Sequence, residues 1–233
     1  MPVAGRSFDG ANVYAAADMP AIDLLVITHD HYDHMDYDTI RALLPKVKMA
    51  CTSLGVGAHL QYWGIPKEKV LEFDWWETQQ VNPLVTLTAT PARHFSGRAV
   101  RSNRTLWSAF VLQLPGINIF IGGDSGYGDH FTEIGARFGP FSLALLECGQ
   151  YNERWPYIHM MPEETIQAAI DLKAEVLMPV HWGKFALSLH TWDEPINRAT
   201  ASAAQRNVRV TTPRIGEAVI IGHHYPKEPW WKW

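Results

Sequence analysis

The chain has 233 residues, of which 47% are hydrophobic and 19% are charged, and its formal net charge is -4. This composition is typical of a globular protein, and it excludes the strongly basic surface that nucleic-acid-binding proteins present. No apolar run reaches the about 20 residues that cross a bilayer, and two cysteines cannot form a disulfide framework. We therefore expect one domain over residues 1–233, in the cytoplasm, with neither a transmembrane segment nor a nucleic-acid partner.

The first clear elements follow an N-terminal stretch with weak periodicity. Residues 1–21 are rich in alanine, glycine and aspartate, and we expect them to be irregular. Residues 22–28 form an apolar run that predicts a buried strand. Residues 37–44 have helical spacing, with Asp36 as the predicted N-cap and Pro45 as the stop.

The rest of the chain alternates between predicted strands and predicted helices. Strands are expected at residues 47–51, 70–73, 85–90, 106–114, 117–122, 143–146 and 176–180, with two more near Val208 and Val219. Helices are expected at residues 55–63, 131–138, 162–174 and 195–205. This alternation indicates a layered α/β fold.

Chemistry concentrates in the loop after the first strand, His29-Asp30-His31-Tyr32-Asp33-His34. In a tight loop, His29 and His31 can face one ion while Asp33 and His34 face a second. Imidazole together with carboxylate suits zinc, iron or manganese better than calcium or magnesium. The stretch therefore predicts a metal site, which we expect to hold two Zn²⁺, with iron or manganese as alternatives.

Three further metal-competent residues also follow predicted strands, namely His94, Asp124 and His181. Because strands of one sheet bring their carboxyl ends together, these side chains are expected to converge on the loop. The predicted partition gives each ion three ligands of its own and makes Asp124 the bridge, since a carboxylate has two oxygens and neutralises charge between two cations. The two sets are His29, His31 and His94 for one ion, and Asp33, His34 and His181 for the other.

These residues and intervals resemble the metallo-β-lactamase superfamily, over a region from Asp23 to about Ile221. Within the superfamily, four further stretches resemble the branch that contains N-acyl-phosphatidylethanolamine-hydrolysing phospholipase D and its bacterial relatives. These stretches are Asp74-Trp75-Trp76, Arg93-His94-Phe95-Ser96-Gly97-Arg98, Gly123-Asp124-Ser125-Gly126-Tyr127 and His181-Trp182-Gly183-Lys184-Phe185.

The resemblance implies a four-layer αββα sandwich, a dinuclear zinc site and hydrolysis by a metal-bound hydroxide. It favours a phosphodiesterase acting on a small-molecule or lipid-like substrate. Asp33, beside Asp124, is expected to orient the nucleophile. His159 matches a family position beside the metals, where it would assist the leaving group, although a residue that precedes a helix can equally be structural.

Two features depart from the family pattern. Members normally have a β-hairpin or two before the first metal motif, whereas only 28 residues precede His29 here. The first sheet is therefore expected to be incomplete at the N-terminus, and an exposed strand edge would encourage pairing with another copy of the chain. The second departure lies at Leu146-Glu147-Cys148-Gly149-Gln150-Tyr151 and Tyr157-Ile158, where the lipid-hydrolysing members carry other pocket residues.

Several alternatives stay open on the sequence alone. The function could be that of a lactonase resembling the ascorbate-phosphate lactonase branch, or of a non-catalytic or redox di-metal protein. Arg93 and Arg98 flank His94 and could hold either a phosphate or an internal ion pair. Trp75 and Trp76 are assigned to packing, and Cys148 to the core.

Overall fold

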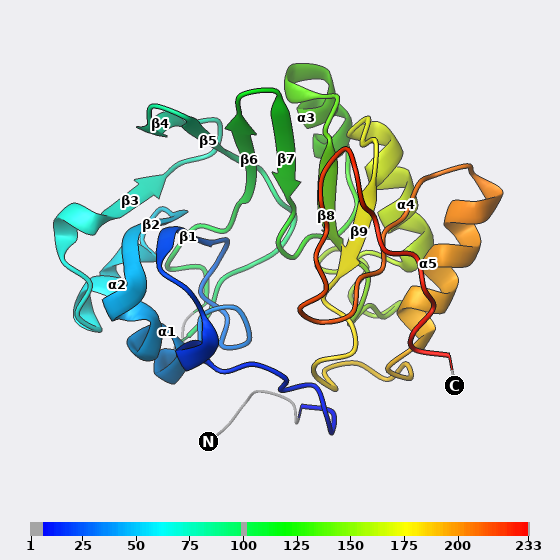
Figure 1. The fold of residues 1–233 in the computed structure, drawn as a ribbon, viewed down its shortest axis with the longest axis horizontal. Helices are drawn as coiled ribbons and strands as arrows, with labels where there is room; N and C mark the ends of the chain where they lie inside the picture. Colours follow the sequence, from blue (N-terminus) through cyan, green and yellow to red (C-terminus); the bar gives the residue numbers. More distant parts are fainter. Residues whose placement is uncertain (1–6, 99–101, 233) are drawn as a thin grey trace.

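The computed structural model describes residues 7–98 and 102–232, which fold around two β-sheets (Figure 1). The smaller sheet has three parallel strands in the order β1-β2-β3. These strands are β1 (Ile22–Ile27), β2 (Val47–Ser53) and β3 (Val70–Phe73).

The larger sheet has six strands in chain order, β4 to β9. Neighbouring strands are antiparallel from β4 to β7, and β7, β8 and β9 are parallel. The bounds are β4 (Thr78–Asn82), β5 (Val85–Thr90), β6 (Ala109–Leu114), β7 (Ile117–Ile121), β8 (Leu143–Glu147) and β9 (Leu177–Val180).

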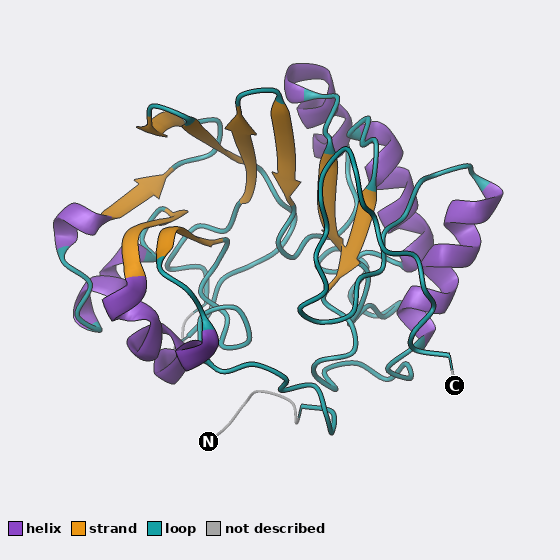
Figure 2. Ribbon diagram, in the orientation of Figure 1, coloured by secondary structure: helices purple, strands orange, loops and turns teal. Residues whose placement is uncertain are grey.

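The helices cover the outer faces of both sheets (Figure 2). Two lie beside the small sheet and three beside the large sheet. The first two are α1 (Tyr37–Leu43) and α2 (Gly57–Tyr62), and the other three are α3 (His130–Phe138), α4 (Pro162–Asp171) and α5 (Glu194–Gln205). Short 3-10 turns occupy Ala16–Asp18, Leu44–Lys46 and Lys67–Lys69.

The apolar core has three layers, because successive side chains of a strand point to opposite faces of its sheet. Strand β6 contributes to two of these layers. Phe110 faces the small sheet, where it packs near Phe73, while the next residue, Val111, faces the outer helices with Phe131 of α3. A third cluster joins the small sheet to its own helices through residues such as Ile40 and Leu60. The order helix, sheet, sheet, helix is the four-layer αββα architecture expected from the sequence.

The carboxyl ends of the strands that carry the candidate residues share one edge of the molecule. In Figure 1 the arrows of β7 and β9 point in the same direction, towards the lower side of the view. Since β7, β8 and β9 are parallel, the residues that follow them meet at this edge, and β5 reaches it from the same direction. The loop after β1 arrives from the facing sheet.

Most predicted elements are confirmed within a few residues. The predicted N-cap is present, because the Asp36 carboxylate accepts a hydrogen bond from the Thr39 amide at 2.8 Å. Strand β4 was missed because its alternating residues are polar or half-exposed. The strands expected near Val208 and Val219 are wrong, since the structure has only isolated bridges there, at Val210 and Ile220.

The N-terminal segment agrees with the expectation of irregular structure. Residues 7–21 contain one isolated bridge, from Ser7 to Phe185, and one 3-10 turn, but no strand. The small sheet accordingly ends at β1. In the part of the chain that the structure describes, no helix has the length and apolar character needed to span a bilayer.

The layer between the sheets gives a first prediction. Phe110 is fully buried, and its ring meets that of Phe73 edge-on at 5.9 Å between centroids. Replacing it by alanine (Phe110→Ala) should lower the free energy of unfolding by about 3–5 kcal/mol, because the cavity is closed in by both sheets. Urea denaturation measures this loss. Leu84→Ala, at a side chain that is 64% exposed, is the control and should change stability by less than about 0.5 kcal/mol.

Candidate metal centre

Three histidines from two loops form the first group of possible ligands. His29 and His31 follow β1, and His94 follows β5. The Nδ1 atom of His31 lies 3.1 Å from Nε2 of His29 and 3.2 Å from Nε2 of His94. Ligand atoms around a tetrahedral zinc ion with Zn–N bonds of about 2.0–2.1 Å stand about 3.3 Å apart, so this spacing suits one cation.

A second group lies beside the first and contains both charges and imidazoles. Asp33, His34, Asp124 and His181 make it up. The Nε2 atoms of His34 and His181 are 3.2 Å apart, and each lies 3.4 Å from Oδ2 of Asp33. Four ligand atoms at these separations suit a second cation of the same kind.

One oxygen belongs to both groups. Oδ2 of Asp124 lies 3.0 Å from His34 Nε2 and 3.4 Å from His181 Nε2 in the second group. It also lies 3.9 Å from His29 Nε2 and 3.8 Å from His94 Nε2 in the first group. The other carboxylate oxygen, Oδ1, is buried and has no hydrogen-bond partner among the described residues. A buried carboxylate with an unpartnered oxygen fits a role in holding cations.

Contacts of the Nδ1 atoms, on the side of the ring away from the group, fix the orientation of two of the imidazoles. Nδ1 of His94 lies 2.9 Å from the carbonyl oxygen of Ile158, so Nδ1 carries the proton and donates it there. Its Nε2 lone pair then faces the group. Nδ1 of His29 lies 3.0 Å from the Thr28 hydroxyl in a similar arrangement. Such partners orient metal-ligating histidines and set their tautomers.

Burial keeps the first group neutral. It lowers the pKa of His94 to about 3 and holds the pKa of His29 well below its usual value. The nearby Asp124 carboxylate opposes this effect without overcoming it. Neutral imidazoles with free lone pairs are the form in which histidine binds metals.

Attraction between carboxylates and a protonated imidazole stabilises the second group. Burial alone would lower the pKa of His34, but the Asp124 and Asp33 carboxylates raise it to about 10. Burial likewise opposes ionisation of Asp33, yet hydrogen bonds with His181 and His34 lower the pKa of its carboxyl. Without cations, His34 therefore stays protonated at neutral pH and compensates the carboxylates that a metal ion would neutralise when bound.

The sequence analysis missed one residue of this region, Glu147. It is fully buried at the carboxyl end of β8, and its Oε2 lies 3.3 Å from Nδ1 of His159. Its Oε1 accepts a hydrogen bond from the Met160 amide at 2.9 Å. Glu147, His159 and His181 can also be grouped as metal-competent side chains. The signal was present, because Glu147 ends a buried strand, as the other candidates do.

His159 lies beside both groups rather than in either of them. Its ring is stacked on that of His181 at 5.5 Å and meets that of His94 edge-on at 5.2 Å. Burial lowers its pKa, but the Glu147 carboxylate more than offsets this, and the pKa of His159 rises to about 9. A protonated imidazole is thus held next to the candidate ligands.

A small cavity of about 160 Å³ opens onto the site. Candidate ligands and His159 form its floor. Aromatic, aliphatic and amide side chains form its walls, namely Phe95, Gln150, Trp155, Ile158 and Leu187.

Gln150 holds one wall of this cavity in place. Its Oε1 accepts hydrogen bonds from the amides of Leu187 at 3.1 Å and Ser188 at 2.9 Å, and its Nε2 donates to the Phe185 carbonyl at 2.8 Å. The segment 185–190, which carries Leu187, is therefore tied to the loop after β8.

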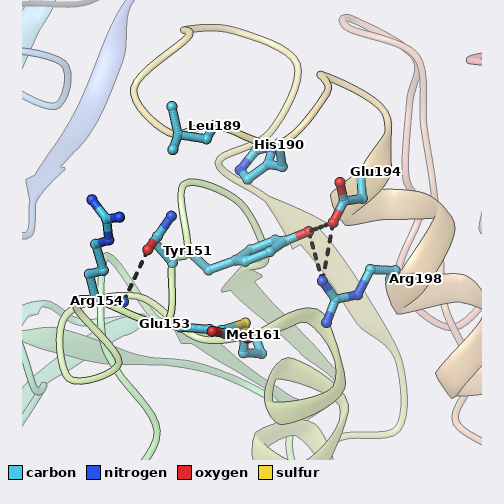
Figure 3. A pocket seen from close by; sticks show the side chains of 9 residues that line it. Tyr151, Glu153, Arg154, Met161, Leu189, His190, Glu194 and Arg198 are labelled. Atoms are coloured by element: carbon cyan, nitrogen blue, oxygen red, sulfur yellow. Dashed lines mark hydrogen bonds and ion pairs between the residues drawn. The ribbon is translucent and has the colours of Figure 1, made fainter.

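The far side of this segment borders a separate, open pocket of about 510 Å³. Figure 3 shows the Tyr151 ring across it, with the hydroxyl directed to Glu194 and Arg198 of α5. His190 stacks on Tyr151 at 4.6 Å between ring centroids. Arg198 also pairs with Glu163 and Glu194, so its charge is compensated by neighbouring carboxylates.

Other residues selected from the sequence have structural contacts. Asp30 lies in the motif but turns away, and its Oδ1 accepts a hydrogen bond from the Gly97 amide at 2.8 Å. Arg98 donates to the carbonyls of Asp30 and Met35. Arg93 donates to the Tyr127 carbonyl and lies over the Tyr157 ring. Both arginines thus brace loops around the site.

The loop that carries Asp124 has its own support. The Ser125 hydroxyl accepts a hydrogen bond from the Arg93 amide at 2.9 Å and lies 3.2 Å from Nε2 of His130. His130 is the first residue of α3. Burial, followed by the charge of Arg93, lowers the pKa of His130 to about 4.

Comparison with known proteins places this site in context. A family model described as "Beta-lactamase superfamily domain" matches residues 6–182. An uncharacterized protein of Mycobacterium tuberculosis strain H37Rv is 45% identical over 220 residues, which cover 93% of this chain and 59% of that protein. The chain thus spans about three-fifths of the length of this relative.

Two other proteins share less sequence identity with this chain. The mitochondrial N-acyl-phosphatidylethanolamine-hydrolyzing phospholipase D of Saccharomyces cerevisiae is 37% identical over 188 residues, or 76% of this chain and 40% of that protein. Among solved structures, the metallo hydrolase Igni18 of Ignicoccus hospitalis superposes with a TM-score of 0.68 at 21% identity. It covers 85% of this chain and 79% of that structure, and it supports the fold alone.

His130 generates a prediction about acid stability. Its pKa is about 4 in the folded protein against 6.5 as the ordinary value, so the unfolded chain binds the proton first as pH falls. The stability that depends on neutral His130 is complete above pH 6.5 and is lost towards pH 4. At pH 5 this loss is about 2 kcal/mol.

Metal-free wild type and His130→Gln should therefore differ in the slope of stability against pH. Urea unfolding from pH 7 to pH 4.5 measures both slopes, and the variant should lose stability less steeply. Exposed His223 supplies a control, His223→Gln, that should reproduce the wild-type slope. Parallel curves for wild type and His130→Gln would contradict the buried, neutral state of His130.

Proposed function

The chain belongs to the metallo-β-lactamase superfamily, and we propose that it is a metal-dependent hydrolase that cleaves phosphodiesters at a two-cation centre. The proposal depends above all on one observation, that Asp124 Oδ2 stands between two sets of ligand atoms, each spaced to suit one cation. The ligands are His29, His31 and His94 for one ion, Asp33, His34 and His181 for the other, and Asp124 for both.

The chemistry expected of such a centre comes from the ions, with zinc as the first candidate and iron or manganese as alternatives. When bound, two divalent cations would lower the pKa of a water towards about 7 and polarise a phosphoryl oxygen. The Asp33 and Asp124 carboxylates, each with Oδ2 3.4 Å from His181 Nε2, would help to orient that water. Because burial keeps His29 and His94 unprotonated, their imidazole lone pairs would be free to bind an ion.

His159 is proposed to handle the leaving group. Its imidazole lines the cavity beside the ligands and is protonated at neutral pH because Glu147 lies against Nδ1. The free Nε2–H can donate a hydrogen bond or a proton to an oxygen that departs as an alkoxide. Glu147 does not line the cavity, so its part is to position His159 and keep it charged.

The cavity and the relatives together favour a phosphodiester that bears an apolar group. Phe95, Trp155, Ile158 and Leu187 line the cavity together with the polar candidate ligands, and such a mixed lining suits an amphiphilic substrate. The yeast relative is named for hydrolysis of such a lipid. Because the chain spans only part of that relative, the lipid-like substrate is part of the proposal and is tested with it.

Loss of the bridging carboxylate should remove metal and activity together. For Asp124→Ala we expect the zinc content to fall below two ions per chain and turnover of a phosphodiester such as bis(p-nitrophenyl) phosphate to drop at least about 10³-fold. Elemental analysis and initial rates measure both. Asp129→Ala, at an exposed residue five positions away, is the control and should behave as wild type.

The wild-type protein must also prefer phosphodiesters among substrates of similar size. A panel that adds lactones and β-lactams to the phosphodiesters decides this point. Faster turnover of a lactone would replace the phosphodiesterase assignment, and full activity in Asp124→Ala would remove the two-cation centre itself.

Removal of the Glu147 charge should lower kcat without loss of zinc from the metal centre. Glu147→Gln keeps an acceptor for the Met160 amide but no longer stabilises protonated His159. We expect kcat to fall by about 10²-fold and the zinc content to stay at the wild-type value. Glu163→Gln, at an exposed glutamate on α4, is the matched control. An unchanged kcat in Glu147→Gln would contradict the role given to His159.

A further inference from the structure

We propose that four tryptophans form a latch that holds His181 in place at the second group of ligands, so that the C-terminal segment, residues 226–232, is a positioning element of the centre. The latch consists of Trp182, Trp192, Trp230 and Trp231. The inference rests on the proposed two-cation centre for its consequence, but the packing behind it does not depend on that function.

His181 has a backbone conformation that needs support. Its φ angle is 64°, in the left-handed region that residues other than glycine rarely adopt, and Gly183 two positions later has a φ of 70°. The reversal lets the chain leave β9 while His181 Nε2 turns to within 3.4 Å of Asp33 and Asp124. Such a conformation is unfavourable for a residue with a Cβ atom and persists only where its surroundings hold it.

One side of the turn is held by the strand next to β9. The Cys148 amide donates a hydrogen bond to the Val180 carbonyl at 3.0 Å. Gly149 lies so close that a Cβ atom there would stand 2.3 Å from the His181 carbonyl oxygen. These contacts fix the backbone on the side of β8 but leave the following residue, Trp182, to be held from elsewhere.

The other side is held by aromatic stacking around Trp182. Its ring is stacked on Trp230 at 5.3 Å and on Trp192 at 6.3 Å, and Trp231 meets it edge-on at 5.7 Å. The Trp182 indole also donates a hydrogen bond to the Pro179 carbonyl at 3.2 Å, which closes the turn. Stacking of this kind stabilises beyond the area it buries.

The latch is itself fastened to the body of the protein. Trp231 is buried, and its indole donates to Oδ1 of Asn197 on α5 at 2.9 Å. The Trp230 indole donates to the Thr212 carbonyl at 3.1 Å, and the Thr212 amide donates to Pro226 at 2.8 Å. In Figure 1 the C-terminal segment, in red, runs beside α5 to its end.

The consequence for the centre is selective. Of the two proposed ion sites, His181 belongs only to the second, whereas the ligands of the first are carried by the loops after β1 and β5. The family match ends at residue 182, so three of the four latch residues lie beyond it. Weakening the latch should therefore loosen one ion and spare the other.

The test compares zinc binding by the metal-free chain in wild type, Trp230→Ala and Trp230→Phe. Trp230→Ala should weaken binding of one Zn²⁺ by about 10–100-fold and leave the other within about threefold, because displaced supporting residues cost that much in metal affinity. Trp230→Phe, which retains a stacking ring, should recover most of the loss. Trp76→Ala is the matched control, at a half-buried tryptophan under Arg137 near α3, and should change neither site.

Hydrogen exchange of the metal-free chain gives a readout that is independent of zinc. Exchange of the Cys148 amide, which bonds to Val180, should accelerate in Trp230→Ala, while that of the Gly122 amide, which bonds to Leu145 at 2.9 Å, should not. If Trp230→Ala does not fold, Trp192→Ala removes the partner on the other stack and should give the same selective pattern.

Equal loss at both zinc sites, or no loss in a folded variant, overturns the latch. Uniformly faster exchange at Cys148 and Gly122 does so as well, because it reports general destabilisation. A wild-type chain that binds fewer than two zinc ions contradicts the proposed function instead, and the exchange measurement then decides the latch alone.

Discussion

The arrangement around the centre depends on one buried carboxylate. Asp124 is 5% exposed, yet one oxygen approaches four imidazoles at 3.0–3.9 Å and the other has no hydrogen-bond partner among the described residues. A buried ionised group without compensation costs several kcal/mol, so its surroundings must supply positive charge. Protonated His34 supplies it in the metal-free chain, and the geometry suits cations in the same role.

The scaffold provides this arrangement by bringing strand ends together and by local departures from regular backbone. His94 follows β5 and Asp124 follows β7, two strands that run in the same direction, and Glu147 ends β8, the parallel neighbour of β7. Gly123, with a φ of 63°, lies against Thr28, where a Cβ atom would stand 2.9 Å from the threonine side chain, so the two sheets approach closely just before the ligands. His181, directly after β9, likewise has a positive φ of 64°.

A second layer of residues connects the centre to its cavity. Glu147 orients His159, the Ile158 carbonyl orients His94, and Gln150 ties the segment that carries Leu187. These contacts come from the end of β8 and from the segment that follows it.

The sequence by itself determined the α/β class, most strands and helices, and the set of residues that converge, because apolar periodicity marks strands and polar side chains at strand ends share an edge. It could not reveal that Asp30 of the histidine-rich loop turns away to Gly97, or that Glu147 lies against His159, because side-chain direction in a loop is set by neighbours remote along the chain. It also predicted strands near Val208 and Val219, where the chain forms only isolated bridges, from Val210 to Leu177 of β9 and from Ile220 to His224. Only the tertiary structure decided that one oxygen of Asp124 lies within 4 Å of imidazoles from both groups and that Trp230 and Trp231 pack beside the residue after His181, since both facts depend on how separate layers meet.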